Sequence, residues 1–297
     1  MSPDSRKVTV QVEDRSLTLS NLDKVLYPAA GFTKAQVIDY YLRISTVMLP
    51  HLASRPVTIK RYPEGVDGQF FYQKNAPAGT PDWVPTARLP SPGSTKSRET
   101  IEYILGGDLP TLIWAANLAA LELHTPMWRH PSVGEPDLLV FDLDPGPPAT
   151  ITKCCQVALL LRPALADLGL EPLAKTSGGK GMQLYARLTG MTSEQASDLA
   201  KGLAERLERE KPDLVVSRMT KALRPGKVLI DWSQNNAAKT TIAPYSLRAR
   251  PEPTVSTPVT WDEVEACEHA SDLVFTAAQV LDRVADAGDL FGGVLGG

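Results

Sequence analysis

The stretch from Leu138 to Gly146 (Leu-Leu-Val-Phe-Asp-Leu-Asp-Pro-Gly) limits what this chain can fold into more than any other segment. A short apolar run that ends at Pro-Gly predicts a buried strand followed by a turn. Side chains alternate between the faces of a strand, so Asp142 and Asp144 should point to the same side. Two such carboxylates repel each other unless a cation lies between them, and Mg²⁺ and Mn²⁺ prefer oxygen ligands. The alternative is a strand-end turn in which the aspartates cap backbone N–H groups.

The composition is that of a soluble globular protein. The chain has 297 residues, of which 43% are hydrophobic and 22% are charged. We expect a single domain over residues 1–297. No apolar run approaches the roughly 20 residues of a membrane helix, and the first residues lack the apolar centre of a signal peptide, so we expect a cytoplasmic protein without a membrane partner. The adjacent Cys154 and Cys155 lack Cys-x-x-Cys spacing, which predicts no zinc site.

Charge is distributed unevenly along the chain. The formal net charge is −3, which argues against a protein that coats nucleic acid indiscriminately. Residues 201–250 nevertheless contain eleven Lys or Arg and five Asp or Glu, whereas residues 251–297 contain one Arg and nine Asp or Glu. This pattern indicates phosphate contacts confined to one surface, and the alternative is an ordinary solvated charged face.

We expect an α/β fold, with a mixed or largely antiparallel central sheet around the aspartates and helices packed outside. We expect a hairpin over residues 8–19, a Pro-, Gly- and Ser-rich connection over 75–98, and a lone aspartate, Asp231, at the end of a second apolar strand. The expected helices are 33–49, opened by a capping box of Thr33 and Gln36, then 110–123, 152–168, 192–210, 261–269 and 276–287. The expected strands are 57–61, 68–74, 138–144, 173–176 and 228–231.

Two further segments carry candidate functional side chains. Phe70 and Phe71 are adjacent in a strand, so at least one should face away from the core, either as a platform on which a base stacks or packed under a loop. The run Thr176-Ser-Gly-Gly-Lys-Gly181 allows backbone N–H groups to approach an anion closely. It matches neither a phosphate-binding Walker loop nor a dinucleotide fingerprint, and a glycine-rich hairpin turn is the alternative.

Seven motifs occur in a fixed order along the chain. They are Asn-x-Asp-Lys-Val-Leu-Tyr-Pro (21–28), Phe-Phe (70–71), Glu-x-His-x-Pro-x-Trp (122–128), Phe-Asp-x-Asp-Pro-Gly (141–146), Thr-Ser-Gly-x-Lys-Gly (176–181), Asp-Trp-Ser-Gln-Asn (231–235) and Lys-Thr-Thr-Ile-Ala-Pro-Tyr-Ser-Leu-Arg (239–248). This series resembles the polymerase domain of bacterial DNA ligase D, in the archaeo-eukaryotic primase superfamily. The resemblance covers about residues 15–290, nearly the whole chain.

The resemblance implies a template-directed nucleotidyltransferase that uses two Mn²⁺ or Mg²⁺ ions and nucleoside triphosphates, with a preference for ribonucleotides. The metal ligands and catalytic residues that it implies are Asp142, Asp144 and Asp231. The implied nucleotide-binding residues are His124, Ser177, Lys180, Gln234, Arg248 and Lys60. Asn21, Lys24 and Lys34 match a pocket for the 5′-phosphate of the downstream strand, and Phe70 and Phe71 match aromatics that stack on the template.

The resemblance also implies an organisation and a setting. Residues 1–110 would form a DNA-end-binding part, 111–250 the catalytic core, and 251–297 an acidic helical end. The expected partner is DNA with a 5′-phosphorylated gap or break end, bound by a monomer near the bacterial nucleoid, and Ku and a DNA ligase are candidate protein partners. No Lys-x-Asp-Gly ligase motif occurs, so we expect a stand-alone polymerase or an excised domain.

One residue departs from the family pattern. The family usually has histidine where this chain has Gln183, and glutamine can donate and accept hydrogen bonds but carries no charge. If this side chain only orients an aspartate, activity should survive; if it must be cationic, catalysis should weaken. Two alternatives to a polymerase therefore remain: a DNA end-binding and bridging module with weak or lost synthesis, and a metal-dependent phosphodiesterase that uses the same aspartates.

Overall fold

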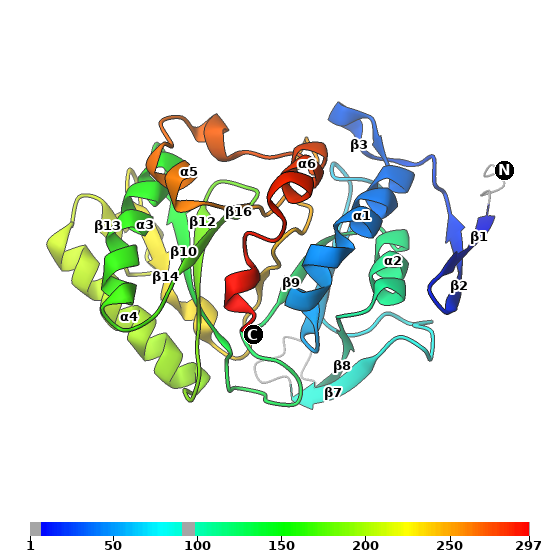
Figure 1. Ribbon diagram of the computed structural model, residues 1–297, viewed down its shortest axis with the longest axis horizontal. Coiled ribbons are helices and arrows are strands. Elements are labelled where there is room, and N and C mark those ends of the chain that lie inside the picture. The colour runs from blue at the N-terminus through cyan, green and yellow to red at the C-terminus, as the bar shows by residue number, and fades with distance from the viewer. Residues whose placement is uncertain (1–6, 91–98, 297) are drawn as a thin grey trace.

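The described strands form two six-stranded sheets that lie side by side, one in each half of the molecule, and two separate two-stranded sheets, β1-β2 and β3-β4 (Figure 1). The computed structural model describes residues 7–90 and 99–296. One six-stranded sheet has the order β13-β14-β10-β12-β11-β16, and the other has the order β15-β9-β5-β8-β7, with β6 paired to β5. Among these pairs only β13 and β14 run parallel. The expected mixed, largely antiparallel α/β fold is confirmed, with two sheets where one was expected.

The elements have the following bounds. The helices are α1 (Lys34–Leu52), α2 (Leu109–Asn117), α3 (Ile151–Ala166), α4 (Ser193–Glu210), α5 (Trp261–Glu265) and α6 (Ala277–Ala287). The strands are β1 (Lys7–Val12), β2 (Arg15–Ser20), β3 (Val25–Tyr27), β4 (Phe32–Thr33), β5 (Pro56–Arg61), β6 (Phe71–Gln73), β7 (Thr86–Pro90), β8 (Thr100–Leu105), β9 (Ala120–Thr125), β10 (Leu138–Pro145), β11 (Leu173–Thr176), β12 (Met182–Arg187), β13 (Val215–Val216), β14 (Val228–Asp231), β15 (Thr241–Ile242) and β16 (Pro258–Val259). None of the described helices is long and apolar enough to cross a membrane.

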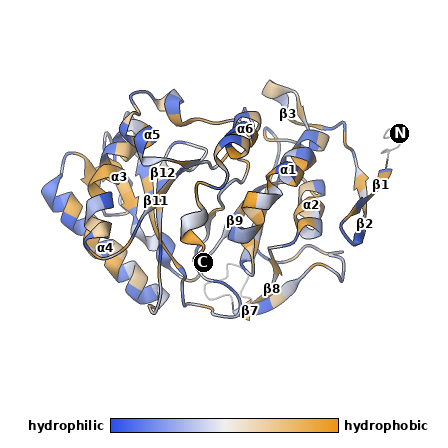
Figure 2. Ribbon diagram, in the orientation of Figure 1, coloured by the Kyte–Doolittle hydropathy of each residue, from blue (hydrophilic) through white to orange (hydrophobic). Residues whose placement is uncertain are grey.

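The sheet that contains β10 packs against α3 and α4 in a hydrophobic core of its own (Figure 1). Along α4, hydrophobic and hydrophilic residues alternate at helical spacing (Figure 2), and the buried side includes Ala200, Leu203 and Leu207. The predicted strand 138–144 is therefore buried on the face that carries Leu139, Phe141 and Leu143, which leaves the aspartates on the other face.

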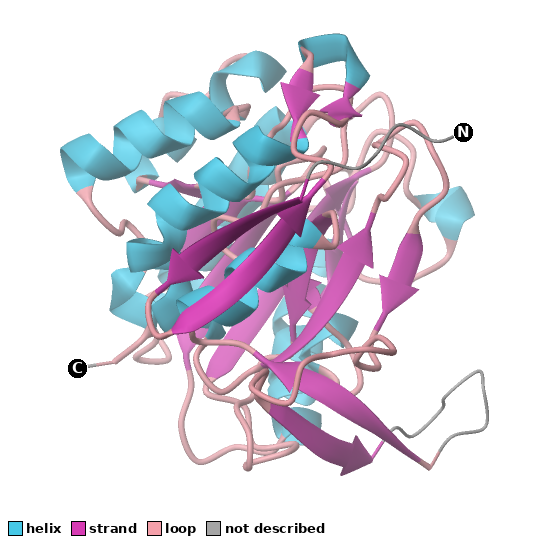
Figure 3. Ribbon diagram, turned by 90° about the vertical axis from the view of Figure 1, so that its right-hand side faces the viewer, coloured by secondary structure: helices cyan, strands magenta, loops and turns pink. Residues whose placement is uncertain are grey.

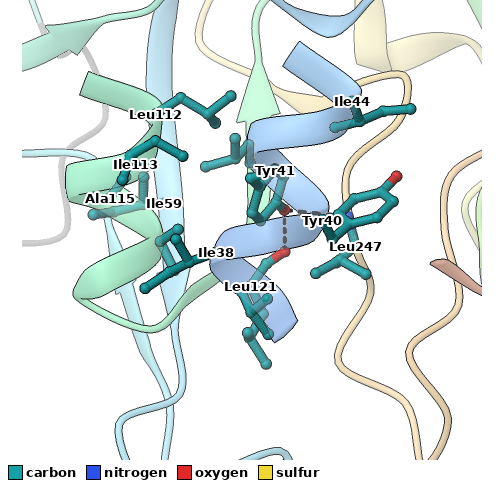
Figure 4. Close-up of a cluster of buried hydrophobic side chains, with 14 of the residues drawn as sticks. Ile38, Tyr40, Tyr41, Ile44, Ile59, Leu112, Ile113, Ala115, Leu121 and Leu247 are labelled. Atoms are coloured by element: carbon teal, nitrogen blue, oxygen red, sulfur yellow. Dashed lines mark hydrogen bonds between the residues drawn. The ribbon is translucent and has the colours of Figure 1, made fainter. Parts of the chain in front are cut away.

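The sheet that contains β9 forms a second core with α1 and α2. Hairpin β1–β2 lies across the outside of this half (Figures 1 and 3). The capping box predicted at the start of α1 is confirmed, because the Thr33 side chain accepts from the Gln36 backbone and the Gln36 side chain accepts from the Thr33 backbone. Inside the core, the Tyr41 hydroxyl donates to the carbonyl of Leu121 at 2.7 Å, which joins α1 to β9 (Figure 4).

The C-terminal segment connects the two halves. Strand β16 pairs with β11 in one sheet, and α6 then packs against α1 through Val280, which belongs to the core of the other half. Beyond α6, the carboxylate of Asp289 accepts from the Tyr245 hydroxyl at 2.6 Å and lies 2.9 Å from Nε2 of His51. The acidic end of the chain thus holds both sheets together.

Several predicted elements differ from the observed ones. The helix predicted over 110–123 ends at Asn117, where the side chain bonds to the hairpin backbone, and Ala119 (φ +58°) turns the chain into strand β9. The apolar run continues through both elements, so hydrophobicity alone could not divide them. The expected connection 75–98 contains β7, and its residues 91–98 lie outside the described part of the chain. Helix α1 continues through Pro50 for two residues, and α5 ends at Glu265.

Candidate active site

The three candidate aspartates lie on neighbouring strands. Asp142 on β10 is directly opposite Asp231 on β14, and Asp144 follows two residues later on the same face of β10. Opposite residues of an antiparallel pair have Cβ atoms about 4.5–5.5 Å apart, so the backbone register brings carboxylates from two separate parts of the sequence together. The expectation that Asp231 would lie near the other two aspartates therefore agrees with the observed pairing.

The carboxylates destabilise one another in the charged form. Burial, and next the charge of Asp144, raise the pKa of Asp142 to about 7. Burial and the charge of Asp231 raise the pKa of Asp144. A hard divalent cation would relieve this repulsion, so the chemistry of the three side chains fits the metal ions that the sequence predicted.

The third carboxylate is turned toward its own loop. Asp231 accepts hydrogen bonds from the backbone N–H of Ser233 at 3.1 Å and from Nε2 of Gln234 at 2.8 Å. Among residues 7–90 and 99–296, no three His, Cys, Asp or Glu side chains converge closely enough to hold one ion. In this conformation the three aspartates therefore do not converge on one ion position, and the hydrogen bonds from Ser233 and Gln234 hold the Asp231 carboxylate toward its own loop.

Gln183 lies beside Asp142 on β12, which pairs with β10 on the side away from β14 and Asp231. Its Nε2 donates to Oδ1 of Asp142 at 3.0 Å, and its Oε1 accepts from Nζ of Lys175 at 2.6 Å. Lys175 is fully buried and also donates to the carbonyl of Ile242 and the hydroxyl of Ser256. Because Nζ of Lys175 donates to the Oε1 end of the Gln183 amide, the Nε2 end is the one that faces Asp142. A neutral amide is thus able to orient the aspartate.

A cavity of about 250 Å³ opens between the two sheets at this point. It is lined by His124, Asp142, Asp144, Ser177, Lys180, Gly181, Gln183, Gln234, Thr240, Thr241, Ile242, Arg248 and Arg250. Seven of the nine residues predicted to bind metal or nucleotide are among them; of the other two, Asp231 is paired with Asp142, which lines the cavity, and Lys60 is paired with Glu122. Sequence reasoning did not select Thr240, Thr241 or Arg250.

The glycine-rich run forms one wall of the cavity. The Ser177 hydroxyl accepts from the backbone N–H groups of Gly179 and Gly181, which makes a tight turn. A Cβ atom on Gly181 would lie 2.2 Å from the carbonyl oxygen of Leu143, so only glycine allows this turn to approach β10. Arg248 donates to the carbonyl of Ser177 at 2.9 Å and joins the turn to the cationic side of the cavity.

The aromatic residues of the segment 70–72 are exposed. The exposed fractions of Phe70, Phe71 and Tyr72 are 51%, 46% and 49%, so the rings are not packed under a loop. Nζ of Lys60 lies 4.2 Å from the centroid of the Phe70 ring. Tyr72, which sequence reasoning did not select, lies with its ring 5.9 Å from His124 and its hydroxyl 3.1 Å from Oγ1 of Thr240. Tyr72 thus lies next to two residues that line the cavity.

The lysines expected to grip a 5′-phosphate lie close together but already have partners. Lys24 pairs with Glu64 at 2.8 Å, and Nζ of Lys34 donates to the carbonyl of Ser20 at 2.6 Å. Burial, and next the charges of Lys24 and Arg61, lower the pKa of Lys34 to about 8. Asn21 has φ +53°, and its carbonyl accepts from the backbone of Lys24, so it shapes this turn.

Comparison with known proteins assigns the chain to a family. The family described as the LigD primase-polymerase domain matches residues 33–291, most of the chain. The chain belongs to this family. It is 48% identical over 275 residues to the multifunctional non-homologous end joining protein LigD of Mycolicibacterium smegmatis, covering 92% of this chain and 35% of that protein. The bifunctional LigD of Bacillus subtilis is 33% identical, over 92% of this chain and 43% of its own length.

A solved member of the LigD family has the same fold. The polymerase domain of Mycobacterium tuberculosis ligase D, in complex with DNA, matches with a TM-score of 0.88 and 43% identity, covering 95% of this chain and 99% of that chain. The present chain spans less than half the length of these two curated LigD proteins. The resemblance read from the seven motifs is therefore confirmed at the level of family and fold.

Proposed function

We propose that this LigD-family domain is a template-directed nucleotidyltransferase that fills gaps or extends ends at DNA breaks before ligation. One observation carries the proposal: one cavity is bounded by Asp142 and Asp144 of one sheet and by the basic side chains His124, Lys180 and Arg248. A nucleoside triphosphate needs both, because its phosphates are anionic and its transfer requires divalent cations.

The roles of the residues follow from their places around the cavity. Two ions held by Asp142, Asp144 and Asp231 would lower the pKa of the primer 3′-OH and neutralise charge on the phosphates. Lys180 and the Ser177 hydroxyl would hold the triphosphate: the hydroxyl oxygen accepts from Gly179 and Gly181, and its proton can be donated to a phosphate oxygen. Lys175 and Gln183 keep the Asp142 carboxylate in one orientation while the ligands bind. This arrangement favours an active enzyme over an end-binding module, since orienting Asp142 does not require the histidine usual in the family.

The proposal extends to substrate and setting. We propose that the domain prefers ribonucleotides, that Lys24 and Lys34 grip the 5′-phosphate of the downstream strand, and that Phe70 and Phe71 stack on template bases. A stacked base contributes about 1–3 kcal/mol. The DNA in the solved relative supports a nucleic-acid partner. We further propose that the domain acts as a monomer at the nucleoid, together with Ku and a DNA ligase.

Incubation of a 5′-phosphorylated gapped duplex with Mn²⁺ or Mg²⁺ and each nucleotide type tests the proposal. Extension supports a polymerase, binding without extension supports an end-binding module, and shortening supports a phosphodiesterase. We expect Asp142→Ala to abolish extension and to leave DNA binding intact, because DNA affinity depends mainly on the lysines. Loss of DNA binding by this variant, or extension at the wild-type rate, would contradict the assignment.

A further inference from the structure

A buried carboxylate that no role has yet explained lies directly behind the cavity. Glu122 is on β9, opposite Lys60 of β5, and its residue exposure is 3%. It does not line the cavity, but its neighbours His124 and Arg248 do. A charged side chain is almost never fully buried unless it is paired, so the partners of Glu122 indicate what it does.

Glu122 contacts cations from three separate chain segments. Nε2 of His124 lies 3.0 Å from one carboxylate oxygen, and Nζ of Lys60 lies 4.0 Å from the same atom. Nε of Arg248 lies 3.3 Å from the other oxygen, which also accepts from the backbone N–H of Ala249 at 3.0 Å. The hydrogen bond from His124 and the charge of Arg248 outweigh the effect of burial and lower the pKa of Glu122 to about 2. The carboxylate is therefore ionised at neutral pH.

One negative charge thus holds together cations that would otherwise repel one another. When His124 is protonated, Lys60, His124 and Arg248 carry three positive charges against the one negative charge of Glu122. Two of these cations, His124 and Arg248, line the cavity. Burial, and then the charges of Arg248 and Lys60, lower the pKa of His124, whereas Glu122 raises it. Without Glu122 the pKa of His124 would fall further, and Lys60 and Arg248 would no longer be held at their present spacing. The carboxylate is therefore positioned to preorganise an anion site that it does not touch.

The geometry also determines how the His124 ring is used. A carboxylate only accepts hydrogen bonds, so Nε2 carries a proton and Nδ1 is the nitrogen left for a ligand. A neutral ring would then present a lone pair at Nδ1, whereas a phosphate oxygen requires a donor. Phosphate binding through His124 therefore requires the doubly protonated ring, whose charge Glu122 stabilises from behind.

We propose that Glu122 is the positioning residue of the triphosphate site: it aligns Lys60, His124 and Arg248 and stabilises protonated His124 when the phosphates bind. This inference rests on the proposed nucleotide-binding function and adds the residue that positions the phosphate-binding side chains. Binding then takes up a proton at His124, so nucleotide affinity falls as the pH rises. The charged and titratable groups around the pair are Lys60, Arg248, Tyr27, Tyr41, Tyr62 and Tyr72.

Kinetics of Glu122→Gln test this role. We expect the KM for the nucleotide in gap filling to rise by about tenfold or more, with a smaller change in kcat and unchanged affinity for DNA. The pH at which KM begins to rise should also move to a lower value, which a merely structural defect would not produce. Glu102→Gln is the matched control, because Glu102 lies on β8 with a side chain 41% exposed and outside the cavity lining. An unchanged KM and pH profile in Glu122→Gln would overturn the proposal.

Binding of inorganic triphosphate, measured by calorimetry without DNA, separates this inference from the proposed function. If the wild type does not extend DNA but Glu122→Gln weakens triphosphate binding, the polymerase proposal fails and the role of Glu122 stands. If Glu122→Gln does not fold, the wild type alone is sufficient, because NMR can follow His124 among only four histidines. Triphosphate should raise the pKa of His124, and a neutral His124 ring in the complex would overturn the proposal.

Discussion

Replacement of Asn235 by alanine should destabilise the fold beside the active site. Strand β14 ends at Asp231, so it pairs with β10 only from Asp142 onward. The Asn235 side chain takes the place of the missing strand: its Oδ1 accepts from the N–H of Val140 at 2.9 Å, and its Nδ2 donates to the carbonyl of Val140 at 2.8 Å. Asn235→Ala removes both bonds from backbone groups that are fully buried.

The cost follows from the two groups left unpaired. Each buried N–H or C=O without a partner costs about 1–3 kcal/mol, so we expect the free energy of unfolding to fall by about 3 kcal/mol. In domains of about 150–250 residues, 1 kcal/mol lowers the Tm by about 2–4 °C, which predicts a decrease of about 8 °C. Asn235→Asp should do no better, because a carboxylate cannot donate to Val140.

Thermal unfolding followed by circular dichroism measures this effect. Asn236→Ala is the control, because Asn236 is the next residue, is exposed, and accepts only from the nearby N–H of Ala238. Gap filling assayed well below both melting temperatures should also slow in Asn235→Ala, since Asn235 anchors the turn that holds Gln234 against Asp231. Equal melting temperatures for the two variants would refute the reasoning.

Three further predictions concern lysines. Lys24→Ala should weaken binding chiefly to 5′-phosphorylated ends, as measured by fluorescence anisotropy; equal losses on unphosphorylated DNA would argue against the pocket. The preference for phosphorylated DNA should decline above about pH 8, because the pKa of Lys34 is lowered to about 8 and phosphate binding requires the charged form of Lys34. Lys34→Arg should remove this decline, because arginine stays charged at this pH. Lys175→Met should lower kcat by about tenfold or more with little change in DNA affinity, because the Gln183 amide loses the donor that orients it. Lys211→Met, at an exposed lysine, is the control. Equal kcat values for the two variants would count against the orienting role of Lys175.

Local signals in the sequence predicted the aspartate strand and much of the cavity. Alternation along residues 138–144 placed Asp142 and Asp144 on one face, and glycines around Lys180 predicted a turn able to approach an anion. These inferences succeeded because each depends on a few consecutive residues. Strand β9 was missed for the opposite reason: its apolar residues continue those of α2, and the positive φ of Ala119 leaves no mark in the sequence.

Residues that act through distant partners could not be found in this way. The role of Lys175 depends on Gln183, Ile242 and Ser256, which only the folded chain brings to its ammonium group. Glu122 and His124 are two residues apart in one strand. Alternation would have placed them on one face if the sequence had indicated that strand. The contact with Arg248, more than a hundred residues away, follows only from the pairing of β15 with β9.

The buried carboxylates of the cavity fall into two opposite electrostatic classes. Burial and neighbouring carboxylates raise the pKa of Asp142 to about 7, whereas cations around Glu122 lower its pKa to about 2 although burial acts in the other direction. Around the first group, on β10 and β14, the effects of burial and of neighbouring carboxylates exceed those of the cations Lys175, Arg224 and Arg248, whereas around Glu122, on β9, basic side chains dominate. A ligand that satisfies both sides must itself combine cations with an anion. A nucleoside triphosphate with its divalent metal ions has this property, whereas a metal ion or a phosphate alone would satisfy only one sheet.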